Sequence, residues 1–309
     1  MEQFKTIHYP SANKKNEVYA RIYPAQGKAR GVLQIVHGIG EHSGRYDEFA
    51  RFMAAAGFIV AVADHLGHGA SIAQQNELGY IGEDGWQYLI DDVRTLSRRV
   101  KKDGIPFILM GHSMGSFIVR TFIIQYPGEA DAVILSGTGQ QSNFMIASSL
   151  FIAALEKKRL GEKGQSKLMY NFSLGSYNKK FKPNRTSADW LSRDEEMVDE
   201  YIADPLCGTY PTVNLFQQML RGMKFIGNMD NIVKMDMTKP VLFLSGDDDP
   251  VGGMGKQVRQ VFNMFDCAGV KDVSIKLYED GRHEMLKEIN RAEVMQDILD
   301  WIAAHVLSE

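Results

Sequence analysis

The segment Phe107-Ile-Leu-Met-Gly-His-Ser-Met-Gly-Ser116 decides the fold. It starts as a charge-free apolar run, turns at a serine between two glycines, and continues with helical spacing. A G-x-S-x-G turn between a buried strand and a helix is typical of a nucleophile elbow, which exposes a serine hydroxyl above a sheet. A Cβ at Gly111 or Gly115 would collide with neighbouring backbone in so tight a turn. The pattern therefore predicts that Ser113 is a nucleophile.

Short charge-free runs on both sides of this segment indicate further buried strands. With residues 107–110, the expected strands are 32–36, 58–63, 132–135, 241–244 and 273–278. Two alternating runs, 4–9 and 18–23, fit an antiparallel edge hairpin. Helical patterns lie at 46–56, 86–102, from 113 onward, 256–265 and 291–306. This alternation predicts the α/β class, with a mostly parallel central sheet flanked by helices.

The alternation stops between about residues 140 and 235, where the patterns are helical. Helices are expected at 144–158 and 213–223, and a capping-box pattern at Ser192 and Glu195 indicates another. Strand-like runs resume at 241, so we expect residues 140–235 to form an inserted helical cap (lid). The core is then expected to comprise residues 1–139 and 236–309.

Charge is uneven within the expected cap. Residues 156–185 contain nine Lys or Arg and two acids, whereas residues 186–204 contain seven acids and one Arg. A basic face beside an apolar helix is compatible with weak contact to a lipid surface. The alternative is that the basic face is exposed to solvent and that the neighbouring acidic stretch balances its charge.

Composition excludes several classes of protein. The chain has 309 residues, 44% hydrophobic and 24% charged, which is typical of a globular protein. A formal net charge of -3 gives no global attraction to nucleic acid. Two cysteines form no disulfide framework, which favours a reducing, cytoplasmic location. The start of the chain has no apolar leader, so a soluble protein is expected.

A serine hydroxyl needs a base, and the base needs a carboxylate that orients it. In this architecture the acid and then the histidine follow the serine along the chain. His283 directly follows the last strand, whereas His305 lies at the end of an amphipathic helix, so His283 is the predicted base. Three aspartates follow strand 241–244. We prefer Asp249, because Pro250 stiffens its loop; Asp247 is the alternative.

Acyl transfer also needs hydrogen-bond donors for the oxyanion. The loop after strand 32–36 and the residue after the nucleophile supply them in this architecture, which indicates the backbone N–H groups of Ile39 and Met114. His37 is then expected to shape the loop. No nucleotide-binding glycine pattern follows residue 40, and His65 and His68 lack a third ligand, so no cofactor or metal is expected.

Five features resemble the monoglyceride lipase and lysophospholipase branch of the α/β-hydrolase superfamily: His37-Gly-Ile-Gly-Glu-His-Ser-Gly-Arg-Tyr46, Asp64-His-Leu-Gly-His-Gly69, Gly111-His-Ser-Met-Gly115, Gly246-Asp-Asp-Asp249 and His283. The resemblance covers about residues 4–307. It implies the α/β-hydrolase fold, with Asp249 as the acid and a cap that forms an acyl-chain tunnel. It also implies head-group contacts from Glu41, Arg45 and Tyr201. In one departure, Leu286 stands where monoglyceride lipases carry a second histidine.

We therefore expect a cofactor-independent serine ester hydrolase, with a monoacylglycerol or lysophospholipid as its small-molecule substrate. The apolar cap residues that suggest an acyl site, or else ordinary core, are Phe144, Met145, Ile146, Phe151, Ile152, Leu215, Phe216 and Met219. One alternative is a peptidase or amidase on the same scaffold. Another is a catalytically silent ligand-binding homologue. Acyl length, head group and oligomeric state are left open by the sequence.

Overall fold

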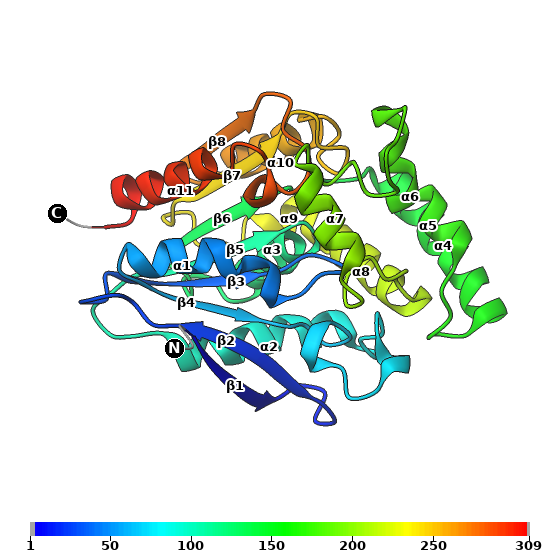
Figure 1. Cartoon of the computed structure of the whole chain (residues 1–309), viewed down its shortest axis with the longest axis horizontal. Helices are drawn as coiled ribbons and strands as arrows, with labels where there is room; N and C mark the ends of the chain where they lie inside the picture. Colours follow the sequence, from blue (N-terminus) through cyan, green and yellow to red (C-terminus); the bar gives the residue numbers. More distant parts are fainter. Residues whose placement is uncertain (1–3, 308–309) are drawn as a thin grey trace.

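The computed structural model describes residues 4–307, apart from the side chain of Gln75, and an eight-stranded sheet runs through its middle (Figure 1). The strands are β1 (Lys5–Pro10), β2 (Glu17–Tyr23), β3 (Gly31–Val36), β4 (Phe58–Ala63), β5 (Phe107–His112), β6 (Ala132–Ser136), β7 (Val241–Gly246) and β8 (Val273–Tyr278). Their order is β1-β2-β4-β3-β5-β6-β7-β8. The β1–β2 and β2–β4 pairs are antiparallel and the others parallel. The expected α/β class and edge hairpin are confirmed.

Helices cover both faces of the sheet. They are α1 (Asp47–Ala55), α2 (Gly85–Val100), α3 (Met114–Gln125), α10 (Lys256–Ala268) and α11 (Arg291–His305). Apolar residues of α1 and α11 belong to one hydrophobic core, and those of α2, α3 and α10 to the other. Strands β3, β5, β6 and β7 are buried along their whole length because both faces are covered. Strand β8 is half-buried because it forms an edge. This is the α/β-hydrolase fold that the resemblance implies.

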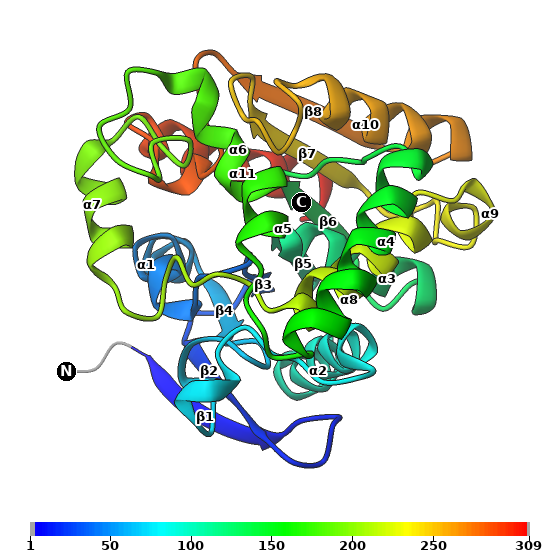
Figure 2. The ribbon, with the colours of Figure 1, turned by 90° about the vertical axis from the view of Figure 1, so that its right-hand side faces the viewer.

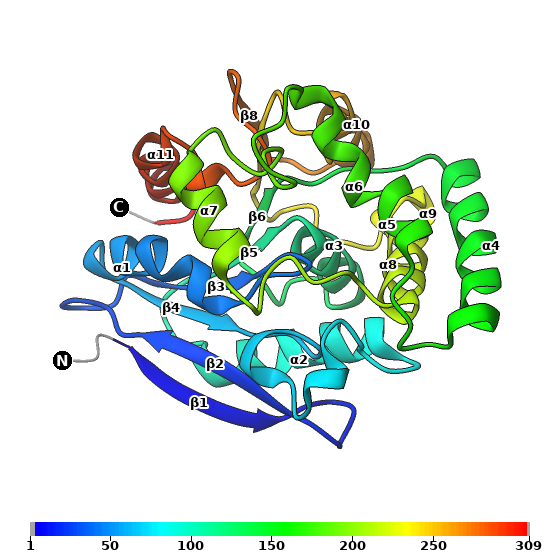
Figure 3. The same ribbon diagram turned by 45° about the vertical axis from the view of Figure 1, so that its right-hand side comes forward.

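Between β6 and β7 the chain forms a group of helices at one side of the sheet (Figures 1 and 2). They are α4 (Asn143–Leu160), α5 (Lys167–Phe172), α6 (Leu174–Tyr177), α7 (Glu195–Ala203), α8 (Val213–Ile226) and α9 (Met229–Ile232). Helix α4 is outermost in Figure 3 and packs on α8, which itself packs on α2 and α3. A Cβ at Gly222 would lie 2.1 Å from the Trp86 ring, so glycine lets α8 approach α2 closely. The division into core and cap stays a prediction.

Helix α4 has 18 residues and carries Lys157, Lys158 and Arg159 in its last turn. Within residues 4–307, no helix combines the length and the apolar character that crossing a membrane requires.

The capping box expected at Ser192 is wrong. Helix α7 begins at Glu195, and its N-cap is Asp194, whose carboxylate accepts from the backbone N–H groups of Glu196 and Met197. The Ser192 hydroxyl instead donates to the Lys287 carbonyl, 2.8 Å away. It also accepts from the Asp194 N–H at 2.9 Å, so Ser192 orders the turn before the helix and Asp194 caps the helix itself.

Candidate active site

The turn after β5 holds Ser113 in a strained conformation. Its φ of 53° and ψ of -123° lie where residues with a side chain rarely occur. A Cβ at Gly111 would lie 2.4 Å from the Gly115 carbonyl oxygen, and one at Gly115 would lie 1.9 Å from that of Val36. Only glycine fits at either position, as the motif predicts. The turn directs Ser113 into a cavity at the N-terminus of α3.

Asp249 and His283 form a buried pair at the ends of β7 and β8. The imidazole Nδ1 lies 3.0 Å from Asp249 Oδ1, and the same carboxylate accepts from the Val251 N–H and the Ser245 hydroxyl. Asp247 and Asp248 are half-exposed, and Asp248 pairs with Lys180. Of the three aspartates, Asp249 is therefore the one that meets the imidazole.

Asp249 and His283 shift each other's pKa. Burial favours neutral imidazole, but the Asp249 charge and hydrogen bond outweigh it and raise the pKa of His283. Burial would likewise raise the pKa of Asp249, yet His283 and the other donors hold it below its usual value. The pair therefore favours a carboxylate beside an imidazole that readily takes a proton.

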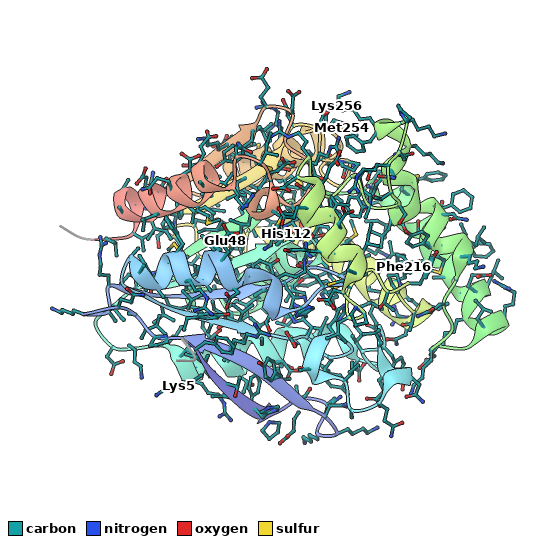
Figure 4. All side chains as sticks on the ribbon, in the orientation of Figure 1. Lys5, Glu48, His112, Phe216, Met254 and Lys256 are labelled. Atoms are coloured by element: carbon teal, nitrogen blue, oxygen red, sulfur yellow. The ribbon has the colours of Figure 1, made fainter. Side chains whose placement is uncertain are left out.

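Ser113 and His283 converge at the end of β6. The Ser113 N–H donates to the Ser136 carbonyl at 2.9 Å, and a Cβ at the next residue, Gly137, would lie 3.0 Å from His283 Cε1. The ring of His112, labelled in Figure 4, lies 4.7 Å from that of His283. The carboxyl ends of adjacent parallel strands thus bring serine, histidine and acid together.

A cap residue that sequence reasoning missed covers the histidine. The Trp190 indole lies 5.1 Å from the His283 ring, and the Trp190 carbonyl accepts from the His283 N–H. The next cap residue, Leu191, accepts from the Glu284 N–H at 2.7 Å. No local spacing connects residues so far apart in the chain, so the sequence contains no signal for this contact.

The loop after β3 lies against the serine. A Cβ at Gly38 would lie 3.0 Å from Ser113 Cβ, and Ile39 lines the same cavity as Ser113 and Met114. Met114 is the first residue of α3, so its N–H has no acceptor within that helix. Both predicted oxyanion donors thus belong to backbone next to the serine.

His37, His65 and His68 form a buried cluster behind this loop. His37 Nδ1 donates to the Gly38 carbonyl, and its Nε2 accepts from the His65 N–H. Burial lowers the pKa of His37, and that of His65 to about 3, so both rings are neutral at physiological pH. These bonds shape the loop, as expected for His37.

Glu41 and Arg45 lie beneath the loop rather than in the wall of the cavity that contains Ser113. Glu41 accepts from the Gly38 N–H and the Tyr46 hydroxyl, while Arg45 pairs with Glu284. The Arg45 guanidinium also lies 4.8 Å from the centre of the Tyr201 ring. Their head-group role stays a prediction. Leu286 lines a small void beside Glu41 and Arg45.

A largely apolar cavity of about 270 Å³, here called the main cavity, opens on Ser113. Of the apolar cap residues singled out in the sequence, Met145, Ile146, Ile152, Phe216 and Met219 line it. Phe216, on α8, lies on the cap side of His112 in Figure 4. Leu215 packs in the core, whereas Phe144 and Phe151 are exposed.

A second cavity of about 170 Å³ lies on the other side of Ile39 and Leu174, which line both. Its wall includes Tyr201, Gly40 and the hydroxyl-bearing Tyr170, Ser187 and Thr209. None of the residues that line either cavity carries a charged side chain.

One group of side chains has the composition of a metal site. Ligand atoms of His42, Asp204 and Cys207 lie within 4.8 Å of one another. His42 Nδ1 accepts from the Gly44 N–H, so its proton lies on Nε2 and is donated to Asp204 at 2.8 Å. A metal would need the Nε2 lone pair, so the observed bonds oppose binding. The group instead joins the loop after β3 to the cap.

The chain is similar in sequence to known hydrolases. Residues 27–290 match the Hydrolase_4 family, described as serine aminopeptidase, S33. The chain is 31% identical over 284 residues to the monoacylglycerol lipase of Mycolicibacterium smegmatis, covering 90% of this chain and 89% of that protein. It is 26% identical to the monoglyceride lipase of Homo sapiens, covering 93% and 86%.

A solved structure is similar over the whole chain. The highly thermostable carboxyl esterase from Bacillus coagulans, in complex with glycerol, has a TM-score of 0.91 and 29% identity. The match covers 99% of this chain and 100% of that one. These similarities span the segments that carry Ser113, Asp249 and His283.

Proposed function

Since the chain belongs to the Hydrolase_4 family and is a serine ester hydrolase of the monoacylglycerol lipase type, we propose that Ser113, His283 and Asp249 form its catalytic triad. Asp249 accepts from His283 Nδ1, which leaves Nε2 to take the proton of the Ser113 hydroxyl. The serine oxygen attacks the ester carbonyl, and the N–H groups of Ile39 and Met114 stabilise the oxyanion. His283 protonates the departing alcohol, and water then hydrolyses the acyl-enzyme.

The observation that carries the substrate assignment is the main cavity. It begins at Ser113 and Met114 and continues between α4 and α8, with Met145, Phe216 and Met219 in its wall. An uncharged, largely apolar wall favours an alkyl chain, because burying apolar surface is favourable and burying an unpaired charge is costly. We propose that the acyl chain of the substrate occupies the main cavity.

The second cavity suits the alcohol. The hydroxyls of Tyr170, Ser187 and Thr209 can exchange hydrogen bonds with a polyol, and Tyr201 lies beside Gly40 on the oxyanion loop. A phosphate would favour Arg or Lys side chains, which its wall lacks. We therefore favour a monoacylglycerol over a lysophospholipid.

Purified enzyme should be tested on monoacylglycerols of increasing chain length, below the concentration at which micelles form. Each added methylene is expected to raise kcat/KM about fourfold until the main cavity is full, since its burial contributes about 0.8 kcal/mol. Lysophosphatidylcholines of the same acyl length are expected to be poorer substrates. A profile independent of chain length would contradict the acyl assignment, and a preference for lysophosphatidylcholine would contradict the head-group assignment.

The residues that line the two cavities favour an esterase over an aminopeptidase. An aminopeptidase must bind the α-ammonium group of its substrate, which calls for a carboxylate near the serine. The residues that line the two cavities provide none. Hydrolysis of p-nitrophenyl octanoate is thus expected to exceed that of aminoacyl p-nitroanilides, and the opposite order would favour the peptidase.

We also infer that the cap contacts a lipid surface. Phe144, Phe151 and Leu155 share the outer face of α4, and their side chains are 78%, 67% and 51% exposed. Lys158 and Arg159 follow them in the last turn of the helix. Exposed apolar side chains with adjacent basic residues can enter the interface of an anionic membrane.

Replacing Phe144 and Phe151 with serine is expected to weaken sedimentation with phosphatidylglycerol vesicles about 10- to 30-fold, since each ring contributes about 1 kcal/mol by partial burial. Hydrolysis of water-soluble p-nitrophenyl acetate should stay unchanged. The matched control is Ile289→Ser, which removes another exposed apolar side chain, 60% accessible, before α11. If the wild-type enzyme fails to bind these vesicles at low salt, the lipid contact is wrong.

A further inference from the structure

A buried arginine lies at the base of the cap, outside the catalytic residues. Arg120, in the second turn of α3, has no exposed surface. Its guanidinium donates to the Gly139 carbonyl at 2.9 Å, to Gln140 Oε1 at 3.0 Å and to the Ile226 carbonyl at 3.2 Å. Within residues 4–307, no carboxylate pairs with it. Neutral oxygens alone therefore compensate this buried charge.

The end of α8 explains how the charge is tolerated. Ile226 is the last residue of α8, where carbonyl groups lack intrahelical donors and carry the negative end of the helix dipole. Gln140, which accepts from Arg120, donates in turn to the Met223 carbonyl at 3.1 Å in the same last turn. Burial lowers the pKa of Arg120 to about 9, so the group is still charged at neutral pH.

These contacts join both covalent connections of the cap. The chain leaves β6 and enters the cap through Gly139 and Gln140, and it leaves α8 at Ile226 on its way back to β7. Arg120 belongs to α3, the helix that begins directly after Ser113. One side chain thus ties the entry and exit of the cap to the helix of the nucleophile.

The backbone that Arg120 holds also forms part of the main cavity. Gly139, Gln141 and Met223 line it. Gly139 lies so close to the acid loop that a Cβ there would be 2.5 Å from the Val251 carbonyl oxygen. The Val251 N–H donates to Asp249 Oδ1 at 2.8 Å. Movement of Gly139 would therefore change the shape of the cavity wall beside the acid loop.

We propose that Arg120 is a positioning residue that sets the shape of the main cavity by holding the entry of the cap and the end of α8 against α3. The inference rests on the proposed function for the identity of the cavity's occupant. Lysine cannot replace the guanidinium, because a single ammonium cannot reproduce its planar fork across three acceptors.

The variants Arg120→Lys and Arg120→Met should be compared with the wild type on p-nitrophenyl octanoate and p-nitrophenyl acetate. We expect the octanoate-to-acetate ratio of kcat/KM to fall about tenfold or more, chiefly through KM for octanoate, since losing the burial of about two methylenes has an effect of this size. The kcat for acetate should change little. A wild-type-like ratio in both variants would overturn the proposal.

The matched control is Phe122→Leu. Phe122 is fully buried in the same helix, and its ring contacts Tyr126, with ring centres 5.4 Å apart. This variant is expected to lose stability but keep the wild-type ratio. If it alters the ratio as much as the Arg120 variants do, general destabilisation explains the result and the proposal is wrong.

Two further measurements separate this inference from the proposed function. In Arg120→Ala, ethylguanidinium should restore the octanoate-to-acetate ratio, whereas ethylammonium, which has no fork, should not. Equal rescue by both would count against the proposal.

Hydrogen exchange should accelerate in residues 137–146 and 222–232 of the Arg120 variants. A flat wild-type chain-length profile would contradict the acyl assignment alone. In that case faster hydrogen exchange in residues 137–146 and 222–232 would still support the role of Arg120 as a positioning residue, and unchanged exchange would overturn it.

Discussion

Replacing Ser113 with alanine is expected to lower kcat for ester hydrolysis by about 10⁶-fold, since removal of a triad serine has effects of this size. The hydroxyl is the group that forms the acyl-enzyme, and the strained turn between β5 and α3 holds it in place. Stopped assays with p-nitrophenyl octanoate measure the residual rate. Mass spectrometry after treatment with a fluorophosphonate should find the wild type labelled once and the variant unlabelled.

The control for Ser113→Ala is Ser97→Ala. Ser97 is a fully buried serine of α2, and its hydroxyl donates to Gln34 Oε1 at 2.9 Å. Loss of this hydroxyl costs about 1–3 kcal/mol of stability without touching the reaction. Its kcat should therefore match that of the wild type. Turnover retained by Ser113→Ala would refute the mechanism, and a wild type that resists labelling would favour a silent ligand-binding homologue.

Much of the sheet could be predicted because its strands are buried on both faces. Runs such as 58–63 and 132–135 contain no charge, and turn residues bound them, so burial alone identifies them. The ends of the observed strands differ from the expected ones by at most two residues. The parallel order follows from alternation with helices. These features depend on residues that are neighbours in the sequence.

The positions of Ser113, Asp249 and His283 could be predicted for a related reason. Each lies in the turn or loop that follows a strand, and the carboxyl ends of parallel strands meet at one edge of a sheet. No comparable rule predicts which distant segments of the chain come into contact. Trp190 covers His283 from the cap, and Arg120 binds the end of α8, yet no spacing in the chain indicates either contact. The contact of the Ser192 hydroxyl with the Lys287 carbonyl, 95 residues away, likewise has no signal in the sequence.

Asp249→Asn is expected to lower kcat by about 10⁴-fold, as loss of the charge of an orienting acid does in a serine triad. An amide in place of the carboxylate can offer its NH₂ group to His283 Nδ1. The imidazole proton then moves to Nε2, which can no longer accept from Ser113. Asp247→Asn and Asp248→Asn are the matched controls, because both aspartates are half-exposed and Asp248 pairs with Lys180 of the cap at the surface. They should keep the wild-type kcat within about twofold, since exposed pairs contribute little.

The pH profile of the same variants tests the electrostatic part of the argument. In the wild type, kcat/KM should fall as the pH drops through the pKa of His283, because the protonated ring cannot take the serine proton. Burial opposes the charged ring, and it is the Asp249 carboxylate that raises the pKa of His283 above its ordinary value. Without that charge burial dominates, so the acidic limb of the residual activity in Asp249→Asn should move to lower pH. If Asp247→Asn instead lost activity and shifted the limb, Asp247 would be the acid that orients the base.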